Sequence, residues 1–77
     1  MSKFAERLKE LRTEKGLPQI KFAKEIGYAQ SIISAWEKGL YEPNANALIA
    51  CATFFDVSTD YLLGLEREDG TKIRVHI

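Results

Sequence analysis

The stretch Gln19 to Gly39 reads Gln-Ile-Lys-Phe-Ala-Lys-Glu-Ile-Gly-Tyr-Ala-Gln-Ser-Ile-Ile-Ser-Ala-Trp-Glu-Lys-Gly. Apolar residues recur at helical spacing before and after Gly27, and the second run contains Ile33 and Trp36. A glycine that follows a helix suits a left-handed C-cap and a sharp change of direction. The stretch therefore predicts two short helices joined by a turn.

The second of these helices has one apolar and one polar side. The two helices, over about residues 18–26 and 30–37, need a small residue where they cross, and Ala23 fills that position. Ile33 and Trp36 fall on the side to be buried. The opposite side carries Gln30, Ser31, Ser34 and Lys38. This arrangement is typical of a helix-turn-helix, a motif whose second helix enters the major groove of DNA.

The composition is that of one small globular domain. The chain has 77 residues, of which 45% are hydrophobic and 29% are charged, enough for a single core. No apolar run approaches the roughly 20 residues of a membrane span, and no apolar signal segment precedes the first helical pattern. We therefore expect a cytoplasmic protein with no membrane partner.

Residues for enzyme or metal chemistry are scarce. Cys51 and His76 are the single cysteine and the single histidine, so neither an internal disulfide nor a metal cluster is expected. Cys51 instead fits a buried apolar position. No serine–histidine–aspartate set and no glycine-rich phosphate loop occurs. The sequence predicts no enzyme, no cofactor and no small-molecule effector domain.

The formal net charge is zero, which by itself argues mildly against a nucleic-acid-binding protein. The charges are unevenly distributed, however. Residues 1–38 carry more lysine and arginine than glutamate, and residues 39–77 carry more acidic than basic side chains. The positive half contains the two-helix motif, so it can meet phosphates although long-range attraction should be modest.

Three further helices are predicted around the motif. The first covers residues 3–15, ends at Gly16, and has an apolar stripe made of Phe4, Leu8 and Leu11. Arg12 and Lys15 on its outer faces could approach phosphate. Asn44 is a candidate N-cap for a helix over residues 45–55, and Ser58 is a candidate N-cap for a short one that Gly64 ends.

The last thirteen residues, 65–77, change period. Lysine, arginine and histidine alternate there with Ile73, Val75 and Ile77, which indicates a strand. A three-residue loop at 68–70 would place Glu66 opposite Lys72, a favourable cross-strand pair. The sequence therefore predicts a short C-terminal β-hairpin. It either builds a dimer interface by strand pairing or folds back on its own domain.

Many residues at fixed spacing resemble the lambda-repressor and Cro family of helix-turn-helix DNA-binding domains, the XRE-like transcriptional regulators. The matching positions are Arg7 to Arg12, Gly16-Leu17, Gln19, Phe22-Ala23, Ile26-Gly27, Gln30-Ser31, Ile33-Ser34, Trp36-Glu37, Gly39, Pro43, Val57-Ser58 and Asp60 to Gly64. The resemblance implies a mainly α, five-helix domain over residues 1–64. It also implies a homodimer that reads a near-palindromic operator in double-stranded DNA as a repressor or activator. The hairpin, residues 65–77, lies outside the shared region.

The resemblance also implies which residues contact DNA. The base-contacting set is Gln30, Ser31, Ser34 and Ala35, and Gln19, Lys21, Lys38, Tyr41 and Asn44 form the set along the phosphate backbone. Gln19 would contact a phosphate or brace the next side chain, and Glu37 would orient nearby backbone or basic groups. Ile32 is either a groove-facing contact to a thymine methyl or a peripheral core residue. Trp36 could stack on a base, but its place beside Ile33 favours the core.

Two departures from the family pattern concern helix caps. Pro18 and Ala29 stand where relatives commonly carry serine or threonine, so both helices of the motif lack a side-chain cap.

A second function remains open as well. Zero net charge and few basic residues near the second helix of the motif are also compatible with an antitoxin or co-regulator module that binds protein and makes weak or no direct DNA contact.

Overall fold

The computed structural model describes residues 2–67 and 69–72, which form five helices. Their bounds are α1 Phe4–Glu14, α2 Gln19–Ile26, α3 Gln30–Glu37, α4 Ala45–Phe55 and α5 Thr59–Leu63. All five predicted helices are therefore present, with ends within a residue of the predicted ones. Pro18 differs slightly: it is the N-cap of α2 rather than its first helical residue, with an extended backbone at φ −63° and ψ 152°.

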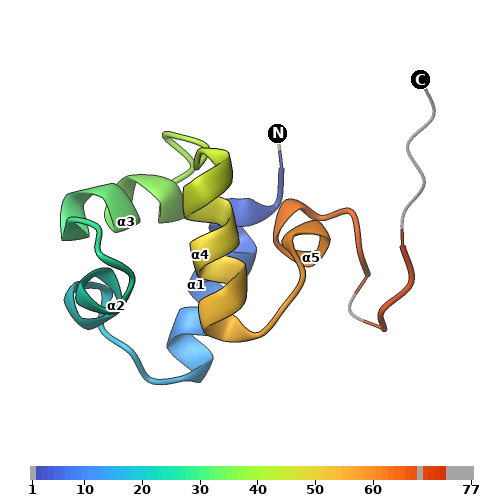
Figure 1. The fold of residues 1–77 in the computed structure, drawn as a ribbon, viewed down its shortest axis with the longest axis horizontal. Coiled ribbons are helices and arrows are strands. Elements are labelled where there is room, and N and C mark those ends of the chain that lie inside the picture. Colours follow the sequence, from blue (N-terminus) through green and yellow to red (C-terminus); the bar gives the residue numbers. More distant parts are fainter. Residues whose placement is uncertain (1, 68, 73–77) are drawn as a thin grey trace.

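The helices are distributed along the longest axis of the molecule (Figure 1). α2 and α3 lie together at one end, α1 and α4 occupy the middle, and α5 lies at the other end. Contacts of α1 with α3 and with α5, and of α2 with α4, join these parts around one core. The two helices of the motif are thus held by the rest of the fold, at a place where α3 borders solvent.

The core is made of apolar side chains from every helix. Its buried members are Phe4, Leu8, Phe22, Ala23, Ile33, Trp36, Ala47, Cys51, Ala52, Phe55 and Leu62. Trp36 is only 4% exposed, and its ring meets the ring of Phe4 edge-on at 5.8 Å and that of Tyr28 at 5.2 Å. The predicted core position of Trp36 is confirmed, so this ring is not available to stack on a base.

Local signals set the helix ends as expected. Gly27 ends α2 in the left-handed region, at φ 79°. Asn44 Oδ1 accepts a hydrogen bond from the Ala47 amide at 2.8 Å. Ser58 Oγ accepts one from the Tyr61 amide at 3.0 Å. These bonds satisfy amides that a helix start leaves without backbone partners, so α4 and α5 begin where the sequence predicts.

The predicted C-terminal β-hairpin is not present as a pair of strands in the described residues. One isolated antiparallel bridge joins Glu66 and Lys72, the pair that the sequence favoured, and Gly70 has the left-handed φ of 90° expected for the turn. Isolated two-stranded ribbons are marginal. In this segment the Arg67 amide donates to the Thr71 carbonyl at 2.7 Å, and side chains add further contacts. Lys72 binds Glu66, and its Nζ also lies 3.3 Å from Asp60 Oδ2. Ile73, Val75 and Ile77 lie outside the described residues.

Hydrogen bonds from Lys72 and from Ser58 lower the pKa of Glu66 below its ordinary value. The carboxylate is therefore charged at neutral pH and can hold both partners. Cys51 is the opposite case, because burial raises its pKa to about 12 and keeps the thiol protonated. This agrees with the predicted role of Cys51 as a small apolar core residue.

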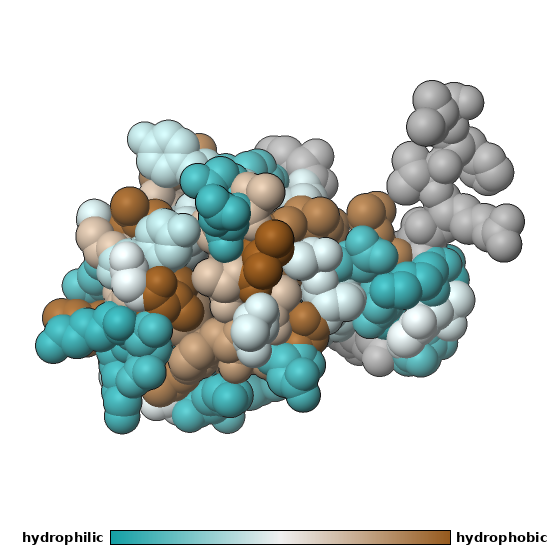
Figure 2. Space-filling view, in the orientation of Figure 1, coloured by the Kyte–Doolittle hydropathy of each residue, from teal (hydrophilic) through white to brown (hydrophobic). Residues whose placement is uncertain are grey.

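The surface keeps several large apolar side chains. Those classed as exposed are Ile20, Ile32, Leu40, Tyr41 and Ile49. On the face shown in Figure 2 the apolar atoms lie in small areas separated by polar ones, so that face has no continuous apolar surface of the kind that marks a protein interface. None of the helices in the described part of the chain is long and apolar enough to cross a bilayer.

Candidate nucleic-acid interface

The outward side of α3 carries the predicted base-contacting residues. Gln30 and Ser31 at its first turn are exposed, and Ser34 and Ala35 one turn later are partly exposed. Beneath them Ile33 is fully buried and Trp36 nearly so. Ile32 is 40% exposed and is therefore not one of the buried core residues; its contact with a thymine methyl stays a prediction. α3 therefore presents a polar edge on a rigid apolar support.

A chain of hydrogen bonds links this edge to the interior. Gln30 Nε2 donates to Gln19 Oε1 at 3.4 Å, and Gln19 Nε2 donates to Glu37 Oε1 at 3.1 Å. Glu37 also accepts two bonds from the guanidinium of Arg12, at 2.6 and 2.9 Å. Of the two roles open for Gln19, the structure shows bracing of a neighbouring side chain. Glu37 orients both Gln19 and Arg12.

Arg12 itself faces inward. Its side chain is 11% exposed and that of Glu37 is 3% exposed, and its Nη1 donates to the Leu17 carbonyl at 2.6 Å. The hydrogen bond with Glu37 raises the pKa of Arg12, although burial opposes the rise. Three of the five N–H donors of Arg12 are thus used inside the domain, and the approach of Arg12 to phosphate stays a prediction. Lys15 is also engaged, with its ammonium 5.4 Å from the centre of the Phe54 ring.

The start of α2 borders the same surface. Pro18 makes no side-chain cap, and the first turn of α2 contains no acidic residue. Its leading amides therefore remain available, and the positive end of the helix dipole favours an anion there. Lys21 in this first turn is exposed. The features that weaken the capping of α2 suit a phosphate contact.

The remaining predicted backbone contacts lie between α3 and α4. Lys38 follows α3 and is exposed, and Tyr41 is 69% exposed. Asn44 is exposed too, but its Oδ1 is used in capping α4. Only the amide nitrogen of Asn44 is left to donate to a phosphate. The fold thus brings the nine predicted residues to α3 and to the segments that flank it.

Sequence reasoning missed the pairing of Arg12 with Glu37. The two residues are 25 positions apart on α1 and α3, so no local spacing rule joins them. The prediction that Glu37 orients basic groups pointed in the right direction but did not identify the partner. In the described part of the chain, no group of acidic, histidine or cysteine residues is arranged to hold a metal ion.

Comparison with known proteins gives the class of this domain. A helix-turn-helix family model matches residues 8–62, which contain the whole of α2 and α3. The chain belongs to this helix-turn-helix family, whose members are DNA-binding transcriptional regulators rather than enzymes.

Individual relatives agree with the family match. The chain is 40% identical over 63 residues to the HTH-type transcriptional activator BcrR of Enterococcus faecalis, covering 82% of this chain and 31% of BcrR. It is 33% identical over 70 residues to the HTH-type transcriptional regulator YobD of Bacillus subtilis, covering 91% of this chain and 62% of YobD. The chain thus spans about a third to about two thirds of the length of these relatives.

Solved structures show the same fold. The P22 c2 repressor, crystallised in complex with a synthetic operator, is 32% identical and superimposes with a TM-score of 0.76. The match covers 82% of this chain and 96% of the repressor chain. A transcriptional regulator from Listeria innocua is 31% identical with a TM-score of 0.79, over 88% of this chain and 64% of its own.

Proposed function

We propose that this protein is a sequence-specific DNA-binding transcriptional regulator that represses by occupying a near-palindromic operator, with α3 in the major groove. The observation that supports this most directly is the exposed pair Gln30 and Ser31 above buried Ile33 and Trp36. The crystallised operator complex of the P22 c2 repressor supports the same mode of binding. We place this activity in the cytoplasm.

Gln30 has the donors and acceptors needed to read adenine. One hydrogen of Nε2 is directed to Gln19, and the second hydrogen is left for adenine N7 while Oε1 accepts from adenine N6. Because Glu37 and Arg12 hold Gln19 in turn, little side-chain freedom of Gln30 is lost on binding. Ser31 can donate to or accept from any base, and Ser34 and Ala35 complete the edge.

Phosphate contacts would supply most of the affinity without sequence preference. Lys38 and Tyr41 follow the C-terminal end of α3, and the start of α2, which also carries Lys21, lies beside α3 through the bonds of Gln19. Positive or polar groups on both sides of a recognition helix would fix its register on the duplex. This proposal predicts different effects of substitutions on the two sets of residues.

Gln30→Ala is expected to weaken binding to the preferred operator by about 1–3 kcal/mol and to relax the choice at one base pair. Lys38→Ala is expected to weaken binding to all sequences alike and to reduce the dependence of affinity on salt. Selection of bound sequences from a random DNA pool gives the operator, and gel shifts on single-base variants of it measure both effects.

Lys9→Ala serves as the control, since Lys9 is an exposed cation on α1, outside the predicted DNA-contacting set. Its affinity should equal that of the unaltered protein. Unchanged base preference in Gln30→Ala would contradict the base-reading role of Gln30. Absence of any enriched sequence in the pool would instead favour the alternative function, an antitoxin or co-regulator that binds protein, which the zero net charge makes reasonable.

The proposed operator symmetry requires a dimer. One such domain covers one half-site, and two half-sites recur about 34 Å apart on one face of the duplex. We propose that the segment 65–77 forms or supports the interface between two copies through Ile73, Val75 and Ile77, and that residues 1–64 are the DNA-binding unit. The net charge of zero would permit close approach of two copies at neutral pH.

Two shortened chains test the role of this segment. A chain ending at Lys72 keeps the bonds from Lys72 to Glu66 and Asp60 and removes the three alternating apolar residues. It is expected to sediment as a monomer at concentrations where the full chain is a dimer. A chain ending at Gly64 should behave in the same way. A dimer in both shortened chains would remove the segment from the interface.

A further inference from the structure

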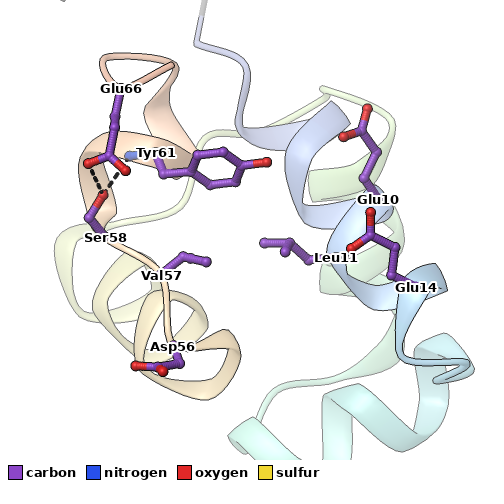
Figure 3. A pocket seen from close by; sticks show the side chains of 8 residues that line it. All are labelled: Glu10, Leu11, Glu14, Asp56, Val57, Ser58, Tyr61 and Glu66. Atoms are coloured by element: carbon purple, nitrogen blue, oxygen red, sulfur yellow. Dashed lines mark hydrogen bonds between the residues drawn. The ribbon is translucent and has the colours of Figure 1, made fainter. Parts of the chain in front are cut away.

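A cleft lies away from the predicted DNA-contacting surface. It has a volume of about 540 Å³ and is bordered by α1, the turn between α4 and α5, α5 itself, and Glu66 (Figure 3). α5 is at the opposite end of the molecule from α2 and α3 (Figure 1). A protein that placed α3 in a DNA groove would therefore leave this cleft open. Its volume is within the range of ligand-binding pockets.

Three of the side chains that line the cleft offer apolar surface within a mostly polar lining. Leu11 from α1 and Val57 from the α4–α5 turn point toward each other, and above them the ring of Tyr61 extends from α5 toward α1 (Figure 3). The guanidinium of Arg7 lies 4.3 Å from the centre of that ring and donates to the carbonyls of Tyr61 and Glu66. These contacts hold the α5 side of the cleft against α1.

The rim carries negative charge. Glu10 and Glu14 stand on the α1 side, and Asp56 and Glu66 on the other. Glu66 is bound to Lys72, but within residues 2–67 and 69–72 no cation pairs with Glu10, Glu14 or Asp56. Two like charges one helical turn apart destabilise a helix slightly. These three exposed carboxylates therefore have no ion-pair partner in the described residues that a bound cation would have to displace.

We propose that this cleft binds a lysine- or arginine-bearing segment of a partner protein. Such side chains have long apolar stems that would lie on Leu11, Val57 and Tyr61, while their charged ends reach the carboxylates at the rim. DNA is an unsuitable occupant, because its phosphates would be repelled by the same carboxylates. The charge of the cleft is complementary to a cationic partner and is opposite to that needed at the DNA surface.

The test starts from peptides selected on the full chain. A random peptide library displayed on phage is expected to yield sequences enriched in lysine or arginine together with apolar residues. A selected peptide, synthesised with a fluorescent label, is then titrated and followed by anisotropy. Glu10→Gln/Glu14→Gln is expected to weaken its binding about tenfold, the size expected when two partly exposed ion pairs are lost.

The matched control is Glu6→Gln/Glu25→Gln, which removes the same charge from exposed positions of α1 and α2 outside the cleft. Its peptide affinity should be unchanged. Asp56→Asn is a second test, because asparagine tolerates the left-handed backbone found at Asp56, with φ 54°. It should weaken binding in the same direction, and thermal melts should show all three variants folded.

Four results would overturn the proposal: selected peptides without basic residues, equal weakening by the control pair, spermidine binding as tightly as the peptide, or loss of self-association in Glu10→Gln/Glu14→Gln. The third would indicate a site for small polycations, and the fourth a contact between two copies of this chain. Peptide binding needs no DNA, and operator affinity of each variant is measured separately. Failure of the cleft proposal is therefore distinct from failure of the DNA-binding one.

Discussion

Trp36→Ala is expected to lower the free energy of unfolding by about 3–5 kcal/mol. The indole is 4% exposed and packs edge-on against the rings of Phe4 and Tyr28. Those two rings come from α1 and from the turn between α2 and α3. Removal of the indole therefore leaves a cavity where α1, this turn and α3 meet. A domain of this size has a total stability of roughly 5–10 kcal/mol, so about half of it would be lost.

A thermal melt followed by circular dichroism measures this effect, and the midpoint should fall by more than about 12 °C. Ile49→Ala is the control, because Ile49 is a large apolar residue of α4 that is 55% exposed. It should shift the midpoint by only a few degrees. An unchanged midpoint in Trp36→Ala would mean that the indole does not support α3.

The second large effect is expected at the ion pair between α1 and α3. Arg12→Met keeps an apolar side chain of similar length but leaves the carboxylate of Glu37 buried without its cation. Loss of one member of a buried ion pair destabilises by about 3–5 kcal/mol. Since Glu37 also holds Gln19, and Gln19 holds Gln30, the variant should also bind operator with less discrimination at the base that we propose Gln30 reads.

The double variant Arg12→Met/Glu37→Met separates charge from packing. It is expected to be more stable than Arg12→Met alone, because no unpaired charge is then buried. Chemical denaturation of the two single variants and the double variant gives the coupling energy. Additive effects would contradict a direct interaction between the two side chains.

An exposed ion pair provides the comparison. The side chains of Lys72 and Asp60 are 56% and 47% exposed, and water screens such a pair strongly. Asp60→Asn should therefore change the unfolding midpoint very little. The contrast with Arg12→Met isolates burial, rather than the presence of opposite charges, as the source of the large effect.

The proposed DNA-contacting surface was predictable to different degrees along its length. Gln30, Ser31, Ile33 and Trp36 follow from helical periodicity, because a helix with one apolar side has its other side exposed. The inward direction of Arg12 did not follow. A charged residue on the outer part of a helix is expected in solvent, and only the approach of α3 to α1 supplies the carboxylate that turns it inward.

The cleft between α1 and α5 was also beyond sequence analysis. Glu10 and Glu14 looked like an ordinary solvated helix face, and Val57 and Asp56 lie more than 40 positions further along the chain. The contact between α1 and α5 places these residues around one space. The periodicity of α1 indicates which of its own residues are exposed, but not which residues from elsewhere in the chain will lie opposite them.

The C-terminal segment shows the limit of local patterning. Turn chemistry at Gly70 and the pairing of Glu66 with Lys72 were predicted and are present. The expected strand pair reduces in the described residues to that single bridge. Whether a short ribbon becomes a ladder depends on what its apolar side packs against, and neither turn residues nor alternation specify that partner.

The sequence by itself determined the helices, their caps and the polar edge of α3, because spacing, glycine conformation and side-chain capping act within a few residues. Tertiary structure decided which charges are buried, which charges are paired, and where the cleft between α1 and α5 opens. Those properties depend on groups 25 to more than 40 positions apart, which meet only when the helices pack.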